Sequence, residues 1–170
     1  ARLNQFPQFT TRIDAHDIHF IHARSKHANA VPLLISHGWP GTIVEFLNVI
    51  DPLTNPEAHG GKAEDAFHVV CPSLPGYGFS GTTQREQVDT LAMAEMFAEL
   101  MARLGYDKYI AQGGDWGAII TSNLAIVDAD HLYGIHLNMP FGYALTEDPH
   151  EGLSPQEIDD VNVIDITTWP

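Results

Sequence analysis

Gly113-Gly114-Asp115-Trp116-Gly117 is the stretch of this 170-residue sequence that decides the predicted fold. It follows a short apolar run, residues 109–111, and it precedes residues 118–125, whose composition is typical of a helix. Strand, sharp turn and helix therefore follow one another directly. Glycines at both ends of the motif lack the Cβ atoms that would collide where the chain reverses so tightly. The turn is predicted to lift the Asp115 side chain to the tip of a sheet, beside the first amides of a helix.

The spacing of this motif matches the turn that carries a catalytic serine in many hydrolases, written G-x-S-x-G, with aspartate in place of serine. The replacement changes the expected chemistry. A carboxylate that attacks a saturated carbon leaves an ester that water can cleave, whereas a serine would leave an ether. Asp115 therefore indicates displacement at an sp³ carbon, as in an epoxide or a carbon–halogen bond. The alternative is an ordinary glycine-rich turn in which Asp115 caps the helix.

A second motif, His37-Gly38-Trp39-Pro40-Gly41, follows the apolar run 31–36, which we expect to be a buried strand. In folds with this type of turn, the loop after an early strand supplies one amide of an oxyanion hole, and the residue after the nucleophile supplies the other. The predicted donors are the backbone N–H groups of Trp39 and Trp116. The alternative is a packed tryptophan in a Pro/Gly turn. Supporting positions are predicted at His37, Gly38, Pro40, Gly113, Gly114 and Gly117.

A third segment, Ser73-Leu74-Pro75-Gly76-Tyr77-Gly78-Phe79-Ser80, comes after another apolar run. In this order the three motifs resemble those of the epoxide hydrolases of the α/β-hydrolase superfamily, and specifically the microsomal-type branch. The segments Leu3–Phe9 and Asp17–His22 also resemble the end of that branch's N-terminal extension and its entry strand. The resemblance covers nearly the whole chain up to about Pro140.

Alternating strand and helix patterns predict an α/β fold with a mostly parallel sheet and helices on both faces. We expect strands near residues 17–23, 31–36, 67–71, 108–112 and 132–138. We expect helices near residues 43–50, 88–104 and 117–127. The resemblance divides the chain into three segments. Residues 1–15 are the end of an N-terminal extension, and residues 16–140 are the N-terminal part of a hydrolase core. Residues 141–170 are the start of a cap that is expected to be poorly ordered by itself.

The remaining catalytic groups of such a hydrolase follow the nucleophile along the chain. After Asp115 only His131, His136 and His150 occur, and we expect all three to be surface or satisfied histidines. The resemblance implies that the general-base histidine, its acid partner and the cap tyrosines that protonate the epoxide oxygen are not present in this chain. We therefore interpret the sequence as an N-terminal fragment, truncated before its cap and last strands. By itself it is expected to form the ester at most.

Charge and cysteine content limit the other function classes. Eight Lys and Arg residues stand against 22 Asp and Glu, a net charge of −14. This field repels nucleic acid and anionic membrane surfaces. No apolar stretch approaches the roughly 18 residues of a membrane-spanning helix, and no histidine spacing indicates a metal. The single Cys71 suits a core position in a cytoplasmic protein.

The resemblance implies hydrolysis of an epoxide to a vicinal diol through an ester on Asp115, without a metal or organic cofactor. It also implies a role in detoxification or hydrocarbon catabolism. The indoles of Trp39 and Trp116 are expected to line an apolar pocket, which favours hydrophobic or aromatic epoxides as the small-molecule partner. Two alternatives remain open. One is a haloalkane dehalogenase, although that class usually has a polar halide-binding residue where Trp39 stands. The other is a non-catalytic scaffold that binds a ligand or partner.

Overall fold

The computed structural model describes residues 2–82, 88–140 and 150–158. The chain divides into two units, residues 1–140 and 141–170, and each is described by itself. In the second unit, residues 155–158 form one helical turn. The Ser154 hydroxyl accepts the Glu157 N–H, and the Glu157 carboxylate accepts the Ser154 N–H at 2.8 Å. The expectation of a poorly ordered cap segment falls mostly outside the described residues and stays a prediction.

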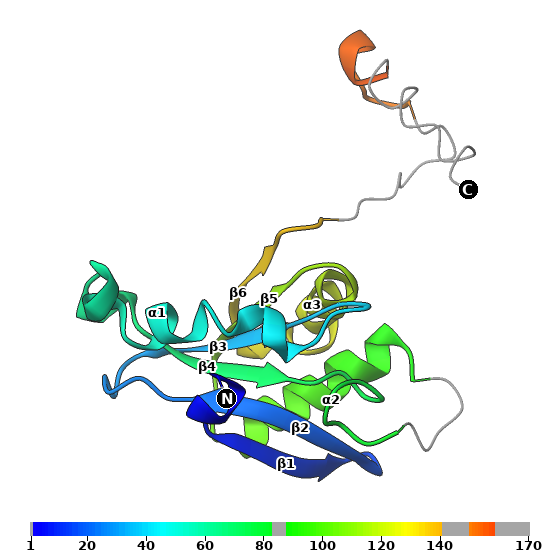
Figure 1. Ribbon diagram of the computed structural model, residues 1–170. Helices are drawn as coiled ribbons and strands as arrows, with labels where there is room; N and C mark the ends of the chain where they lie inside the picture. The colour runs from blue at the N-terminus through cyan, green and yellow to red at the C-terminus, as the bar shows by residue number, and fades with distance from the viewer. Residues whose placement is uncertain (1, 83–87, 141–149, 159–170) are drawn as a thin grey trace. The chain divides into compact units, whose positions relative to one another are not determined.

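The described residues form a six-stranded sheet in the order β1-β2-β4-β3-β5-β6 (Figure 1), with β1 and β6 at its two edges. Strands β4, β3, β5 and β6 run parallel, whereas β1 and β2 pair antiparallel to each other and β2 pairs antiparallel to β4. The predicted fold class is confirmed. The strand bounds are β1 Gln8–Ile13, β2 His16–Ala23, β3 Val31–Ser36, β4 Phe67–Pro72, β5 Tyr109–Gly113 and β6 Leu132–Leu137.

Two long helices, α2 (Thr90–Arg103) and α3 (Trp116–Val127), cover one face of the sheet. The other face packs against α1 (Ile50–Thr54) and the 3-10 helix η2 (Ile43–Phe46). Helix α2 begins where the Asp89 carboxylate accepts the Ala92 N–H at 2.8 Å, which satisfies an amide that has no partner inside the helix. The remaining 3-10 helices are η1 Arg2–Gln5, η3 Pro56–His59, η4 Ala63–Asp65 and η5 Ala129–His131.

The core has two parts, one on each face of the sheet, because a central parallel strand is buried on both sides. In β3, Leu34 packs under α2 and α3, while Leu33 and Ile35 point to the opposite face. Each large apolar side chain that is fully buried stabilises the fold by about 1.5–3 kcal/mol. Cys71 is fully buried, as expected, and burial raises its pKa. No helix within the described residues is long and apolar enough to cross a bilayer.

The prediction of one continuous helix near residues 43–50 is wrong. The chain instead forms two short pieces, η2 and α1, with a break between them. Pro52 explains the break, because proline has no N–H to donate and is tolerated only in the first turn of a helix. A helix that contains Pro52 must therefore begin close to it, and α1 begins at Ile50.

Strand β1 was missed, because residues 1–15 were expected to hold only the end of an extension. It forms a hairpin with β2 through a two-residue turn in which Ile13 pairs with His16. Both turn residues have positive φ, 44° at Asp14 and 65° at Ala15, which is the geometry of a tight hairpin turn. The sequence signal was weak because the usual glycine is absent from this turn.

Burial lowers the pKa of a set of histidines in and beside the core: His19, His22, His37 and His68. Two of them accept backbone hydrogen bonds that protonation would break. His68 Nδ1 accepts the Ser25 N–H at 3.0 Å, and His37 Nε2 accepts the Leu74 N–H at 3.1 Å. Folding therefore favours the neutral form of these rings.

We predict that stability falls as the pH drops below about 6.5, the ordinary histidine pKa. The folded pKa values lie below the unfolded ones, so the unfolded chain binds more protons in this range. The stabilisation is fully present above the unfolded pKa and is lost as the pH falls through the folded pKa. Urea unfolding at about pH 7.5 and about pH 5.5 measures the loss. The free energy of unfolding of His37→Gln should fall less on acidification than that of the parent protein. An equal loss in both proteins would contradict the assignment to His37.

Candidate active site

Asp115 stands at the turn between β5 and α3 with a φ of 53° and a ψ of −131°. L-residues rarely adopt this conformation, and it costs about 1–3 kcal/mol where a fold imposes it. The Asp115 carbonyl accepts the Ala118 N–H at 2.9 Å, so the helix starts directly at the turn. The side chain of Asp115 is exposed and makes no hydrogen bond to the helix amides. Asp115 therefore stands at the N-cap position of α3, but its side chain does not cap the helix as the alternative proposed.

Glycines stand where the chain crosses itself behind this turn. A Cβ atom on Gly113 would overlap the Gly117 carbonyl, and a Cβ on Gly117 would overlap the Ser36 carbonyl. A Cβ on Gly114 would overlap the Asn138 side chain. The motif glycines therefore allow the ends of β3 and β5 and the start of α3 to approach more closely than any side chain would permit.

The loop after β3 reaches the tip of this turn. The Trp39 backbone N–H donates a hydrogen bond to Asp115 Oδ1 at 2.7 Å, across 76 residues of sequence. Gly38 makes the approach possible, because a Cβ there would overlap the Asp115 side chain. The peptide bond between Trp39 and Pro40 is cis. The structure thus brings together the two motifs that carry the predicted nucleophile and the first predicted donor.

The second predicted donor is the N–H of Trp116, the first amide of α3. Within the part of the chain that the structure describes, no hydrogen bond of this N–H is found. The first amides of a helix have no intrahelical acceptor, so this N–H is open to a ligand. Its part in an oxyanion hole stays a prediction.

His37 links the Trp39 loop to the segment after β4. Its Nε2 accepts the Leu74 N–H at 3.1 Å, so Nδ1 carries the proton and donates to the Gly38 carbonyl at 2.9 Å. The ring is buried and lies edge-on to Tyr77, with ring centroids 6.0 Å apart. Burial lowers the pKa of His37, although the Gly38 bond partly opposes this. The ring is therefore held neutral, with both nitrogens engaged in positioning the loop.

Glu45 is a neighbour of the site that the sequence analysis missed. Its carboxylate on η2 lies against Gly41, where a Cβ would overlap Glu45 Oε1. Partial burial raises the pKa of Glu45, the Thr42 backbone N–H lowers it, and the negative charge of Asp115 raises it. Asp115 is thus close enough for its charge to act on Glu45. No sequence pattern marked this residue, because an acid in the first turn of a helix is ordinary.

The two tryptophans were expected to line an apolar pocket. Trp116 lines a cavity of about 340 Å³, together with Leu74, Tyr77, Val88, Asp89, Thr90 and Met93. The Trp39 side chain is 61% exposed and does not belong to this cavity. Trp116 therefore lines an apolar cavity as expected, whereas the Trp39 indole is exposed.

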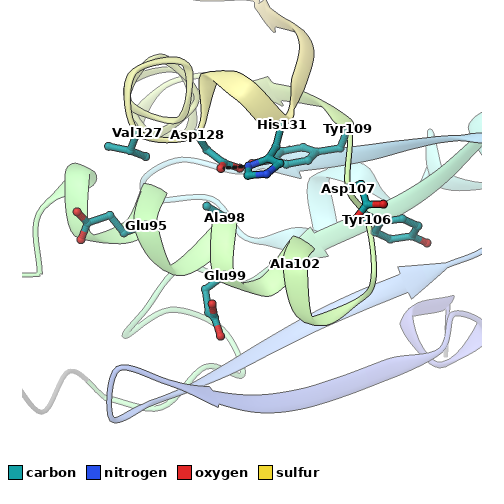
Figure 2. Close-up of a pocket in the computed structure, with 10 residues that line it drawn as sticks. All are labelled: Glu95, Ala98, Glu99, Ala102, Tyr106, Asp107, Tyr109, Val127, Asp128 and His131. Atoms are coloured by element: carbon teal, nitrogen blue, oxygen red, sulfur yellow. Dashed lines mark hydrogen bonds and ion pairs between the residues drawn. The ribbon is translucent and has the colours of Figure 1, made fainter.

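A different cavity, of about 410 Å³, opens beside α2 and the end of α3 (Figure 2). His131 Nδ1 lies 2.5 Å from Asp128 Oδ1, and the Tyr109 hydroxyl donates to Asp128 Oδ2 at 2.6 Å. Asp128 raises the pKa of His131, so this histidine is satisfied by a carboxylate away from the site. The described residues hold no group of three or more side chains suited to a metal ion. The other acids around the cavity are Glu95, Glu99 and Asp107.

His136 and His150 are the other two histidines that follow Asp115 along the chain. His136 lines an apolar cavity of about 540 Å³ against β3, η2 and α1. His150 belongs to the second unit and has a partner there or elsewhere in the chain. No hydrogen bond or ion pair joins Asp115 to a histidine within residues 2–82 and 88–140. In that part of the chain, the predicted nucleophile has a backbone donor and no histidine partner.

Two family models match the chain. Residues 1–46 match the epoxide hydrolase N terminus, and residues 31–164 match the alpha/beta hydrolase fold. Among curated relatives, a "Putative epoxide hydrolase" of Stigmatella aurantiaca is 54% identical over 92% of this chain and 36% of its own length. "Epoxide hydrolase 1" of Oryctolagus cuniculus is 44% identical over 81% of this chain and 31% of its own length. The chain thus spans about a third of these relatives.

Solved structures agree with the family models. Juvenile hormone epoxide hydrolase from the silkworm Bombyx mori is 43% identical with a TM-score of 0.73, over 81% of this chain and 36% of that one. The epoxide hydrolase of Aspergillus niger is 38% identical with a TM-score of 0.75, over 95% of this chain and 42% of that one. The chain therefore belongs to the α/β-hydrolase fold family, and its first segment is that of the epoxide hydrolases.

Proposed function

We propose that this chain carries the nucleophile and part of the oxyanion site of an epoxide hydrolase, which converts an epoxide and water into a vicinal diol. The observation that supports this most directly is the 2.7 Å hydrogen bond from the Trp39 N–H to Asp115 Oδ1. The names of the relatives agree with the proposal. Because the chain spans about a third of those relatives, the activity is proposed for the full-length protein that carries this sequence.

In the first step, one oxygen of Asp115 attacks the less hindered epoxide carbon. Oδ1 is held by the Trp39 N–H, whereas Oδ2 has no hydrogen-bond partner within the described residues and is the attacking atom. A bond forms between Oδ2 and the carbon, the carbon–oxygen bond of the ring breaks, and the ring oxygen takes a proton from an acid. The product of this step is an ester on Asp115.

In the second step, a base takes a proton from water, the water oxygen adds to the ester carbon, and negative charge develops on Oδ1. The Trp39 N–H is already in contact with this atom, and the Trp116 N–H is the proposed second donor. Collapse of the intermediate breaks the bond between the ester carbon and Oδ2, which leaves with the diol and takes a proton. Asp115 then holds Oδ1 and one oxygen from water.

The finer features of the proposal concern substrate and setting. The cavity beside Trp116 supports hydrophobic or aromatic epoxides. The proposal includes a place in detoxification or hydrocarbon catabolism, supported by this substrate class, and a cytoplasmic setting, supported by the buried, unpaired Cys71. The net charge of −14 supports a small-molecule partner rather than nucleic acid.

Asp115→Ala in the full-length protein should abolish turnover of styrene oxide, because it removes the carboxylate that forms the ester. We expect diol formation to fall at least about 10³-fold, measured by chromatography of the diol. Asp107→Ala is the matched control, since it removes an exposed carboxylate beside the other cavity and should retain activity. Diol formation by Asp115→Ala at the parental rate would refute the nucleophile assignment.

A single turnover in heavy-oxygen water tests the ester directly. With enzyme in excess, Asp115 should gain one solvent oxygen, detected by mass spectrometry of the peptide that contains it. The first diol should carry an unlabelled oxygen from Asp115 Oδ2. Direct attack of water on the epoxide predicts the reverse, a labelled diol and an unlabelled peptide.

Comparison of styrene oxide with a bromoalkane separates epoxide hydrolysis from dehalogenation, since both reactions begin with the same carboxylate attack. We expect diol from the epoxide and no bromide release above the buffer background. The residue at position 39 supports this outcome, because an exposed tryptophan stands where haloalkane dehalogenases usually have a polar, halide-binding residue. Bromide release without diol formation would assign the site to dehalogenation instead.

A further inference from the structure

Two carboxylates lie against the loop that carries the Trp39 donor. The Asp115 side chain lies against Gly38. The Glu45 carboxylate lies against Gly41, whose Cβ position is 3.2 Å from the Gly38 carbonyl. A single turn of backbone therefore separates the two acids. The proposed attack on the epoxide uses only the charge of Asp115, so the charge of Glu45 requires a separate explanation.

Neither acid has a basic partner among the described residues. The pKa of Glu45 responds to burial, to the Thr42 N–H and to Asp115, and to no lysine or arginine. Two basic side chains of the described chain pair elsewhere, Arg12 with Asp17 and Arg103 with Glu99. Glu45 is exposed, so its field reaches the solvent in front of the loop. Among the described residues, the solvent side of this loop therefore carries an excess of negative charge.

This excess acts on any charged ligand that approaches Asp115. Charges within about 10 Å interact appreciably at moderate ionic strength, and a third negative charge would meet repulsion from both carboxylates. A neutral ligand would meet none. The repulsion from Asp115 is unavoidable, because its carboxylate is the proposed attacking group. The repulsion from Glu45 is not required for the ester chemistry.

We propose that Glu45 determines the charge specificity of the site, and that it disfavours epoxides bearing a carboxylate or other anionic group relative to neutral epoxides of the same shape. The inference rests on the proposed function, because it concerns the substrate that Asp115 attacks. Glu45 acts through its charge and does not take part in bond formation. The class of substrate that fits this opening is a neutral or cationic epoxide.

The test uses two substrates that differ in one charge: 4-(oxiran-2-yl)benzoate and its methyl ester. The full-length protein is compared with Glu45→Gln, which keeps the size of the side chain and removes its charge. The measured quantity is the ratio of kcat/KM for the anionic benzoate substrate to kcat/KM for its neutral methyl ester. We expect this ratio to rise about 3–10-fold in Glu45→Gln. Glu45→Lys should raise this ratio further. High salt should raise the ratio in the parent more than in Glu45→Gln.

Glu64→Gln is the matched control, because it changes the net charge by the same amount. Glu64 lies on η4, which leads into the first residues of β4, whereas the site lies beyond the last residues of the parallel strands β3 and β5. We expect its ratio to equal that of the parent. An unchanged ratio in Glu45→Gln, or an equal rise in Glu64→Gln, would overturn the inference. Diol formation from the methyl ester substrate in the same assay would show that the proposed function still holds. Absence of diol from both substrates would remove the proposed function and the inference with it.

Discussion

The site depends on one steric constraint, the close crossing of three backbone segments at positions where only glycine fits. Ser36 and Gly113 are paired neighbours at the ends of the parallel strands β3 and β5, so the segments that follow them leave the sheet side by side. Gly117 lets the start of α3 touch the Ser36 carbonyl, and Gly38 lets the next loop touch Asp115. The hydrogen bond between the Trp39 N–H and Asp115 Oδ1 is a consequence of this contact.

The same crossing holds Asp115 in a conformation that it would not adopt alone. The strain of about 1–3 kcal/mol at such a residue must be offset by neighbouring structure. Ile120 and Leu124, on the buried face of α3, are fully buried against the sheet. Each contributes about 1.5–3 kcal/mol, so the packing of α3 exceeds the strain at its first residue. The turn cannot relax without moving this helix off the core.

The sequence predicted the elements that have local signals and missed those that depend on tertiary contacts. The elbow and the Trp39 loop were found because their glycines lie at fixed spacings. The helix near 43–50 was wrong because Pro52 splits that segment, and β1 was missed because Asp14-Ala15 lacks the usual turn glycine. Glu45 was missed because its relation to Asp115 exists only in the folded loop.

On the proposed function, the Trp39 N–H acts unequally on the two chemical steps. Before reaction it binds Asp115 Oδ1, which shares the negative charge of the carboxylate. In the ester this oxygen is a neutral carbonyl, so the hydrogen bond weakens as the ester forms. When water adds, the full negative charge develops on the same oxygen and the hydrogen bond strengthens again. A fixed donor stabilises a transition state only where charge grows toward it, and therefore this N–H accelerates cleavage of the ester rather than its formation.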